Sequence, residues 1–294
     1  MIVRPTSKAV PQRQFVSALV EQVQALAAVQ PAHRRLRDDR GNRFYLFEGP
    51  EARPLPSVTS VLSTIAKPAL TTWSRNTALE AMRDALLRKA GKSITNEILE
   101  QALQEAKQQP RALAGRAAQL GIRGHEAFGR VLSGLGASKP VTAELDQTVS
   151  NFERWWKHSG YVLACSELVV RSERYGYAGQ CDAIAVRLNE AVRTADESSS
   201  RPSASLAVFD WKTTSAIYSE YALQAAAYAK ALEEMSHGTL HVHEAWVVRF
   251  GRMDSEPCFE ARQVRDISAA FLCFRAALIL FNELGETLYN DKGG

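Results

Sequence analysis

The stretch AVFDWKTTS, residues 207–215, begins like a buried strand and then continues directly into charged side chains. Alternate side chains of a strand point to the same face, so Asp210 and Lys212 stand together while Trp211 points the other way, into packing. The pair is either a partly buried salt bridge or half of a site that handles a metal ion and a phosphate. The rest of the chain decides between these interpretations.

The composition is that of an ordinary globular protein, with 294 residues, 46% hydrophobic and 23% charged. This length fits one large domain or two small ones. Apolar stretches are interrupted by charge and none approaches the roughly 18 residues of a membrane span, so we expect no membrane partner. The wide spacing of the cysteines predicts an intracellular, reducing compartment and no disulfide framework. These cysteines are Cys165, Cys181, Cys258 and Cys273.

The positive charge of the chain is concentrated at its beginning. The net charge of +4 argues against a basic protein that coats DNA, but residues 1–43 hold eight Arg and Lys against three acids, with no acid before Glu21. Residues 1–42 are therefore a basic N-terminal extension. It is either a solvated, flexible arm or a targeting segment for the mitochondrial or another organellar matrix.

Residues 43–160 are predicted to be mostly helical. Residues 43–62 contain a short strand, a Gly/Pro turn and Ser/Thr positions that suit a helix cap. Proline is typical of the first turn of a helix and glycine of its end, which divides the remainder into four helices. The predicted helices span residues 61–92, 93–109, 110–132 and 141–160.

Residues 161–294 change to alternating strands and helices. Residues 189–205 are rich in Ser, Asp and Glu and read as a flexible hairpin loop between two strands. The pattern predicts an α/β or α+β domain with one central sheet. The predicted strands are residues 161–173, 175–188, 206–214 and 241–250, and the predicted helices are residues 218–235 and 264–284.

Asp182 changes the weight of the Asp210 and Lys212 pair. It ends the motif YAGQCD, in which Gly179 allows close backbone approach. If strands 175–188 and 206–214 are hairpin neighbours, the two acids converge at one end of the sheet, where they repel each other unless a cation neutralises them. Oxygen ligands favour Mg²⁺ or Mn²⁺ over zinc. The nearby lysine then indicates a shared anionic substrate, of which a phosphodiester is the obvious candidate.

Two further features fit such a site but also have structural explanations. Gln224 and Tyr228 are four residues apart on a predicted helix, so they share one face and either belong to a core network or reach a ligand. His125 follows Gly121 and Gly124, which allow another element to approach its helix closely. A lone histidine is usually structural, although a neutral imidazole can complete a carboxylate metal site.

These motifs occur in a familiar order. A G-x-x-x-H helix, an acid, G-x-x-D, D-x-K and Q-x-x-x-Y follow one another, and the set resembles the PD-(D/E)XK nuclease superfamily, specifically its RecB-like exonuclease branch. Residues 55–73, LPSVTSVLSTIAKPALTTW, also resemble the entry segment of mitochondrial genome maintenance exonucleases and related phage and bacterial nucleases. The resemblance covers roughly residues 43–235. It implies a restriction-endonuclease-like core with a central mixed sheet flanked by helices.

The resemblance also implies the ligands of the metal, which would be Mg²⁺ or Mn²⁺. They are His125, Asp182, Asp210 and the backbone carbonyl of Trp211. Glu167, in CSELVV, matches the family's acid on the first core strand, and we carry it over as an outer residue or occasional ligand. Some RecB-like nucleases hold an iron–sulfur cluster with three cysteines near the C-terminus, and no such cluster is expected in this chain.

The same resemblance implies the catalytic roles. Lys212 would be the catalytic lysine, and Gln224 and Tyr228 would face the site and help to place the nucleic-acid strand. We therefore expect a Mg²⁺- or Mn²⁺-dependent DNA nuclease, an exonuclease that prefers single-stranded ends in repair, replication or recombination. The alternatives are a structure-specific endonuclease and a catalytically silent nucleic-acid-binding module. The tryptophans of the helical part, Trp73, Trp155 and Trp156, are either stacking surfaces for bases or core residues.

Overall fold

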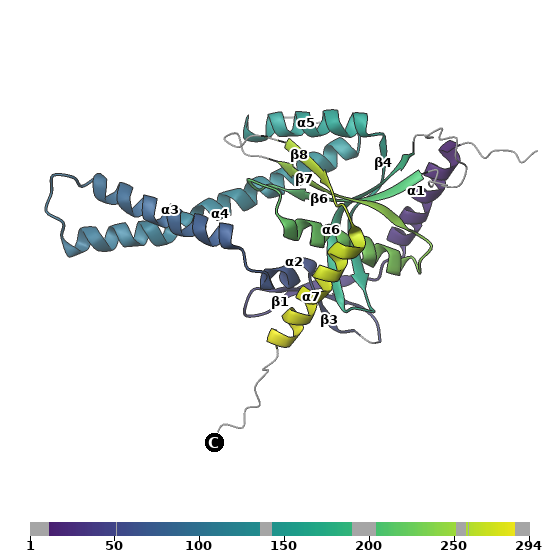
Figure 1. Ribbon diagram of the computed structural model, residues 1–294, viewed down its shortest axis with the longest axis horizontal. Coiled ribbons are helices and arrows are strands. Elements are labelled where there is room, and N and C mark those ends of the chain that lie inside the picture. Colours follow the sequence, from purple (N-terminus) through teal and green to yellow (C-terminus); the bar gives the residue numbers. More distant parts are fainter. Residues whose placement is uncertain are drawn as a thin grey trace, which may run out of the picture.

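The computed structural model describes residues 12–50, 52–135, 143–189, 204–250, 257 and 259–285. These residues form seven α-helices, one short 3-10 helix and two β-sheets, an α/β arrangement as the sequence predicts (Figure 1). The larger sheet is the centre of the fold. Its strands, in spatial order, are β4 (Tyr161–Ser172), β5 (Tyr177–Leu188), β6 (Ala204–Lys212), β7 (Val242–Phe250) and β8 (Phe259–Gln263).

The central sheet is mixed. The pairs β4–β5, β5–β6 and β7–β8 are antiparallel, while β6 and β7 are parallel. A parallel pair needs a crossover connection, and helix α6 (Ser219–Met235) supplies it. All four strands predicted within residues 161–294 are present in this sheet, whereas the sequence analysis missed β8. Strand β8 lies at the edge of the sheet. It is only five residues long and contains charged residues, so its sequence shows little alternation of apolar and polar residues.

The two faces of the sheet carry separate cores, which the alternation along β6 makes clear. Leu206 and Val208 join the cluster beneath α1 (Gln12–Ala28), α6 and α7 (Ile267–Gly285). Phe209 and Trp211 point to the opposite face, towards the C-terminal part of α4 (Asn96–Leu132) and α5 (Ala143–Ser159). Trp211 is therefore buried in packing, as its place in the strand predicts. The polar Asp210 continues the α6 side of the strand.

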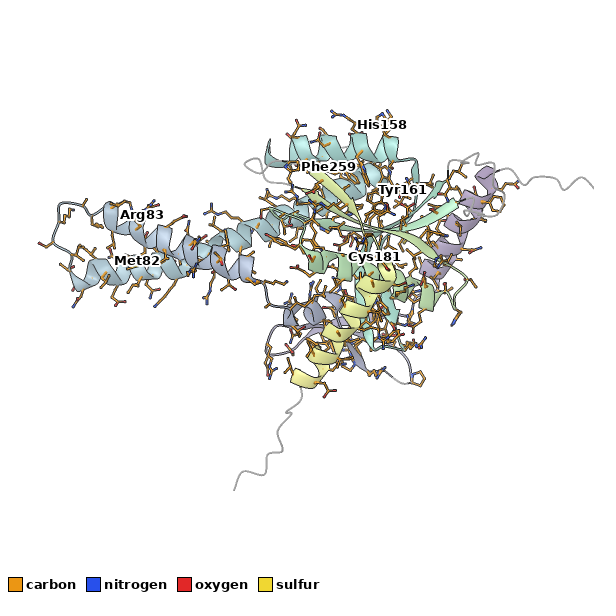
Figure 2. The ribbon with its side chains drawn as sticks, viewed as in Figure 1. Met82, Arg83, His158, Tyr161, Cys181 and Phe259 are labelled. Carbon is orange, nitrogen blue, oxygen red and sulfur yellow. The ribbon has the colours of Figure 1, made fainter. Side chains whose placement is uncertain are left out.

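Helices α3 (Pro68–Leu87) and α4 pack side by side and project away from the sheet (Figure 1). Figure 2 shows Met82 and Arg83 on this projection, while Tyr161 and Cys181 lie in the body of the protein. The predicted boundary between two helices at Pro110 is wrong, because α4 continues through it. A proline inside a helix costs about 3 kcal/mol. Packing anchors both sides of it, since Ala106 and Phe128 are buried.

The helix predicted for residues 61–92 is divided in the structure. Ser57 caps α2 (Val58–Val61), accepting a hydrogen bond from the backbone N–H of Ser60, so the predicted cap is confirmed. A 3-10 turn follows, and α3 starts only at Pro68, where proline suits the first helical turn. The short α2 lies against the central sheet and α6.

The expectation of a solvated arm is wrong for much of the N-terminal segment. Helix α1 packs on β4 and β5, and Val23 within it is fully buried. Next come β1 (His33–Arg37), β2 (Arg43–Phe47) and β3 (Pro54–Pro56), which form the smaller antiparallel sheet. The sequence analysis weighed charge here and overlooked the apolar stripe of α1. Residues 1–11 of the extension, residues 190–203 of the predicted hairpin loop and Cys258 lie outside the described residues.

Helix α7 is more apolar than the sequence analysis recognised. By length and composition, Ile267–Leu284 is the one described helix that is apolar enough to cross a membrane. The single charges within it, Arg275 and Glu283, do not lower its hydropathy enough to exclude a span. Its inner side chains Phe271 and Phe274 pack in the core against Tyr177, so the apolar composition also has a role in packing.

The buried acid Glu244 links β7 to strands β4 and β5 of the central sheet. Glu244 on β7 accepts hydrogen bonds from Tyr161 and from Trp246 Nε1 at 2.9 Å, and it forms an ion pair with Arg187 at 2.8 Å. Burial raises the pKa of Glu244, but these donors outweigh burial and leave the pKa lowered. The charged form of Glu244 therefore stabilises the fold.

We expect Glu244→Gln to lower the free energy of unfolding by about 2 kcal/mol at neutral pH, the size of a hydrogen bond to a charged group. A carboxylate with a lowered pKa contributes stability above its unfolded value, here 4.5, and loses it as the pH falls through the folded value. Urea unfolding at pH 7 and at pH 3.5 measures both. An equal difference between wild type and variant at the two pH values would contradict this role.

Candidate metal centre and active site

The site forms where two antiparallel strands separate. The β5–β6 pairing ends at Ala183 and Phe209, one position before Asp182 and Asp210 would face each other. Beyond that point the Asp182 carboxylate takes the place of the ladder, because Asp182 Oδ2 accepts a hydrogen bond from the backbone N–H of Trp211 at 2.6 Å. The predicted hairpin is confirmed, and both acids lie at the same end of the sheet.

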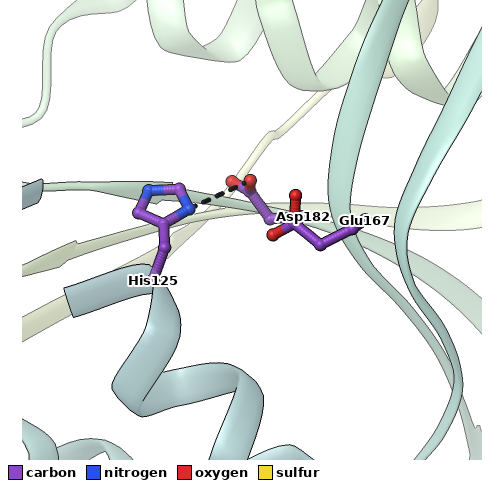
Figure 3. A group of neighbouring side chains, drawn as sticks. All are labelled: His125, Glu167 and Asp182. Carbon is purple, nitrogen blue, oxygen red and sulfur yellow. Dashed lines mark ion pairs between the residues drawn. The ribbon is translucent and has the colours of Figure 1, made fainter. Parts of the chain in front are cut away.

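Three side chains from three elements lie together as a candidate metal site (Figure 3). They are His125 on α4, Glu167 on β4 and Asp182 on β5, with one ligand atom of each within 4.8 Å of the others. His125 Nδ1 is 3.3 Å from Asp182 Oδ1. In the β4–β5 register, the pairs Ser166–Ala183 and Leu168–Cys181 place Glu167 opposite Asp182. An imidazole and two carboxylates so placed can hold a divalent cation.

Glu167 has a strained backbone, which the structure maintains. Its φ of 57° lies in the left-handed region, which is uncommon for a non-glycine residue. The Gln180 side chain donates to Glu167 Oε2 at 2.6 Å and thus fixes the carboxylate beside Asp182. Strain of this kind persists only where surrounding contacts impose it, and it is often found at functional sites. Glu167, which the resemblance implied as an outer residue or occasional ligand, therefore lies among the closest group of possible ligand atoms.

The electrostatics of this group favour a cation. Glu167 is exposed at its outer side, but partial burial and the neighbouring charge of Asp182 raise its pKa. Burial acts to lower the pKa of His125, but the hydrogen bond and charge of Asp182, with the charges of Glu167 and Asp210, raise it overall. The carboxylates thus disfavour one another's ionisation, and a positively charged partner would offset their repulsion.

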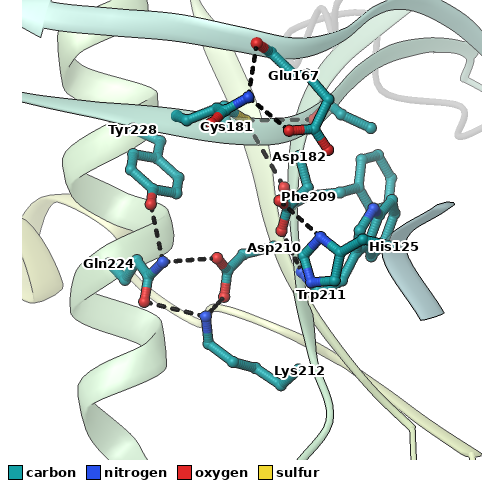
Figure 4. Close-up of polar contacts among 12 residues, drawn as sticks. His125, Glu167, Cys181, Asp182, Phe209, Asp210, Trp211, Lys212, Gln224 and Tyr228 are labelled. Atoms are coloured by element: carbon teal, nitrogen blue, oxygen red, sulfur yellow. Dashed lines mark hydrogen bonds and ion pairs between the residues drawn. The ribbon is translucent and has the colours of Figure 1, made fainter. Parts of the chain in front are cut away.

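A network of polar side chains on the α6 side of the site holds Asp210 (Figure 4). Asp210 Oδ2 lies 2.6 Å from Lys212 Nζ, and Asp210 Oδ1 accepts from Gln224 Nε2 at 2.8 Å. Gln224 also accepts from Lys212 Nζ at 3.0 Å and contacts the Tyr228 hydroxyl at 2.8 Å. The structure therefore shows the salt bridge and the Gln–Tyr network that the sequence analysis weighed as structural alternatives. It also places both beside the candidate metal site.

The ionised form of Asp210 is disfavoured by its burial. Burial raises its pKa to about 6, against the lowering effect of the Lys212 charge. Asp210 Oδ2 is buried and, among the described residues, accepts no hydrogen bond beyond the contact that makes the ion pair. A buried acceptor with spare capacity fits a site that receives a further positive partner.

Glycines allow the elements of the site to approach closely. A Cβ on Gly179 would lie 2.5 Å from Cε1 of Tyr228, which real side chains do not tolerate. A Cβ on Gly121 would lie 3.1 Å from Oγ1 of Thr213, so α4 also lies tightly against the end of β6. The predicted close approaches at Gly179 and Gly121 are confirmed, whereas a Cβ on Gly124 would make only an ordinary contact with Thr213, at 3.7 Å.

All of these side chains line one cavity of about 790 Å³. Each predicted site residue contributes to it, including Trp211, whose carbonyl remains a proposed ligand. The predicted residues on its wall are His125, Glu167, Asp182, Asp210, Trp211, Lys212, Gln224 and Tyr228. The sequence analysis missed Arg35, Arg43 and Gln180, which also line it. Gln180 stands inside the YAGQCD motif, but Arg35 and Arg43 have no sequence signal that places them here.

A second cavity of about 480 Å³ adjoins the first, and both are lined by Thr213. The aromatic side chains on its wall are Trp73, Tyr218 and Tyr221. Trp155 and Trp156 have a different environment, since their rings pack against Phe209 and other aromatic residues on the α5 side of the sheet. Trp73 thus lines a cavity beside the candidate site, whereas Trp155 and Trp156 belong to an aromatic cluster.

Comparison of the sequence with protein-family models and with curated proteins finds no match. Five separate segments bring a histidine, three acids, a lysine and two polar helix residues to one cavity wall.

We expect Mn²⁺ or Mg²⁺ to raise the melting temperature of the protein and EDTA to reverse the effect. A bound cation stabilises the folded state by about 2.7 kcal/mol at a hundred times its dissociation constant. Asp182→Asn and Glu167→Gln are expected to lose most of this gain, measured by calorimetry with added ion. Glu173→Gln removes an exposed acid paired with Arg171, outside the cavity, and should keep it. An equal gain in all variants would exclude this site.

Proposed function

We propose that this protein is a Mg²⁺- or Mn²⁺-dependent DNA nuclease with a restriction-endonuclease-like core of the PD-(D/E)XK type, RecB-like branch. The observation that carries the proposal is the position of Lys212 beside Asp210 on the wall of the cavity that also holds His125, Glu167 and Asp182. Carboxylates and an ammonium group facing one open cavity suit a substrate that is anionic and bound through a cation.

The donor set fits a hard divalent cation. Oxygen atoms predominate, one imidazole completes the group, and no described cysteine lines the cavity. His125, Glu167 and Asp182 would hold the ion, with Asp210 and the carbonyl of Trp211 as further ligands. When bound, such an ion acts as a Lewis acid that lowers the pKa of an attacking water and offsets the charge of the phosphate.

The residues around Lys212 prepare its ammonium group for the reaction. Asp210 and Gln224 both contact Lys212 Nζ, so the ammonium group is fixed between the candidate metal ligands and α6. The ring of Tyr221 lies 4.9 Å from Nζ and restricts the side chain further. In this position Lys212 would orient a water or a phosphate oxygen and stabilise negative charge that develops on the phosphate. Tyr228 holds Gln224 in place.

The aromatic lining of the adjoining cavity favours the proposal of a single-stranded substrate. Trp73, Tyr218 and Tyr221 present aromatic surfaces next to Thr213, at the boundary with the metal cavity. A base that leaves a duplex can stack on such surfaces, which contributes about 1–3 kcal/mol per base. Action from a free end comes from the resemblance of the motifs, so exonuclease activity is the part of the proposal that the cleavage assay tests most directly.

We expect the protein with Mn²⁺ to degrade linear single-stranded DNA and to leave the circular form intact. Lys212→Ala should lower the cleavage rate by at least about 100-fold, the usual loss on removing a group that stabilises transition-state charge. Lys230→Ala is a matched control, because Lys230 lies on the same side of the fold but pairs with Glu233 outside the cavity. Strands labelled at either end, followed on gels, also give the direction of digestion.

The other outcomes identify the alternatives. Cutting of the circle with rates similar to those for the linear strand would favour an endonuclease. Binding of DNA without cleavage under any divalent ion would favour the silent binding module. Full activity of Lys212→Ala would contradict the role of the lysine even if the protein is a nuclease.

We expect Trp73→Ala to raise the KM for single-stranded DNA by about 5- to 150-fold, equivalent to one lost stacking interaction of 1–3 kcal/mol. Trp73→Phe keeps an aromatic face at the same position and should retain most of the affinity. Steady-state cleavage of a short labelled strand measures both variants. A KM unchanged in Trp73→Ala would remove the second cavity from the substrate path.

A further inference from the structure

The smaller sheet carries a row of arginines on one face. In the β1–β2 register, Arg35 pairs with Tyr45 and Arg37 with Arg43, and cross-strand partners point to the same face. Arg35, Arg37 and Arg43 therefore share this face, while Arg34 points to the other. All four side chains are exposed. The face also packs against the central sheet, since Tyr45 is buried against Val169 and Ala178.

The opposition of Arg37 and Arg43 is unfavourable unless an anion joins them. Like charges directly across two strands destabilise a sheet. Protection of an edge strand by charge would explain arginines on β1, but Arg43 lies on β2, the central strand of this sheet. Among the described residues, Arg37 donates to the Gly41 carbonyl at 3.4 Å and Arg43 to the Thr59 hydroxyl at 2.7 Å. Neither contact neutralises a positive charge.

The row is continuous with the metal cavity. Arg35 and Arg43 lie on the wall of that cavity, together with His125 and Asp182. Arg35 also donates to Gln180, the residue that holds Glu167. Arg37 lies two residues beyond Arg35 on β1 and opposite Arg43, so it extends the positive surface beyond the cavity wall along β1.

We propose that Arg43 and Arg37, continued from Arg35, form a track for the phosphates of a single DNA strand that leaves the metal cavity across the β1–β2 sheet. The inference deepens the proposed function and rests on it. An arginine neutralises a phosphate and presents several donors to its oxygens, so successive arginines on one face match a sugar–phosphate chain. The strand would thus be held through its backbone on one side of the metal site.

Binding of a labelled single strand tests the track without cleavage, in Ca²⁺ and over a series of salt concentrations. Each lost phosphate contact reduces the slope of log K against log salt by about 0.7 for a single strand. Arg37→Gln and Arg43→Gln should each weaken binding about fivefold at 0.1 M salt, which is that slope applied between 0.1 and 1 M. The double variant should lower the slope by about 1.4. Fluorescence anisotropy provides the measurement.

Two further variants separate charge from structure. Arg34→Gln removes the same charge from the same strand but on the opposite face, and should keep the wild-type slope. Arg37→Lys keeps the charge and should restore the slope that Arg37→Gln loses. An Arg37→Gln slope equal to that of wild type, or an Arg34→Gln slope lowered as much, would overturn the track.

The assay distinguishes failure of the track from failure of the proposed function. Binding in Ca²⁺ does not require catalysis, and cleavage in Mn²⁺ by the wild-type protein is measured separately. Cleavage with unchanged slopes would contradict the track and leave the nuclease proposal in place. Lowered slopes without cleavage by wild type would support the track on a DNA-binding protein that does not cut.

Discussion

The antiparallel pairing of β5 with β6, and its end at Ala183 and Phe209, is the constraint on which the site depends. Up to that pair the strands are held by a regular ladder inside two apolar cores. Beyond it the Asp182 carboxylate binds the N–H of Trp211, so the strand ends open around polar groups without leaving that donor unpaired. The same opening allows α4 to bring His125 to the acids and α6 to bring Gln224.

The charges at this opening are separated into two groups. His125, Glu167 and Asp182 form a set that favours a cation, while Asp210 is already paired with Lys212. Without the lysine, burial of Asp210 near Asp182 would be still less favourable, since two close carboxylates disfavour each other. The cavity therefore presents a candidate cation site and a fixed ammonium group side by side. The arginines of the small sheet extend the positive surface from the other wall, and the phosphate chain that we propose as the ligand would contact both.

The sequence analysis predicted most of the central sheet and eight residues that line the cavity. Asp210 and Lys212 were found from the strand period and Gln224 and Tyr228 from one helix face, whereas Glu167 came from the resemblance of the motifs. It misjudged features whose outcome depends on distant contacts. Pro110 stays inside α4 because buried residues on both sides anchor the helix. Helix α1 belongs to the fold because an apolar stripe within a basic segment finds a sheet to cover. The apolar character of α7 was underestimated because single charges were taken as interruptions.

The sequence by itself determined which residues are chemically able to act: the D-x-K strand, the acid after a glycine, and the paired Gln224 and Tyr228 share faces through the periods of strand and helix alone. Only the tertiary structure decided which of these residues lie next to one another. Glu167 joins His125 and Asp182 through strand register, and Asp210 is paired with Lys212 beside them. Arg35 and Arg43 reach the cavity only because the small sheet packs beside β5. Such distances are set by long-range packing, which local periodicity does not encode.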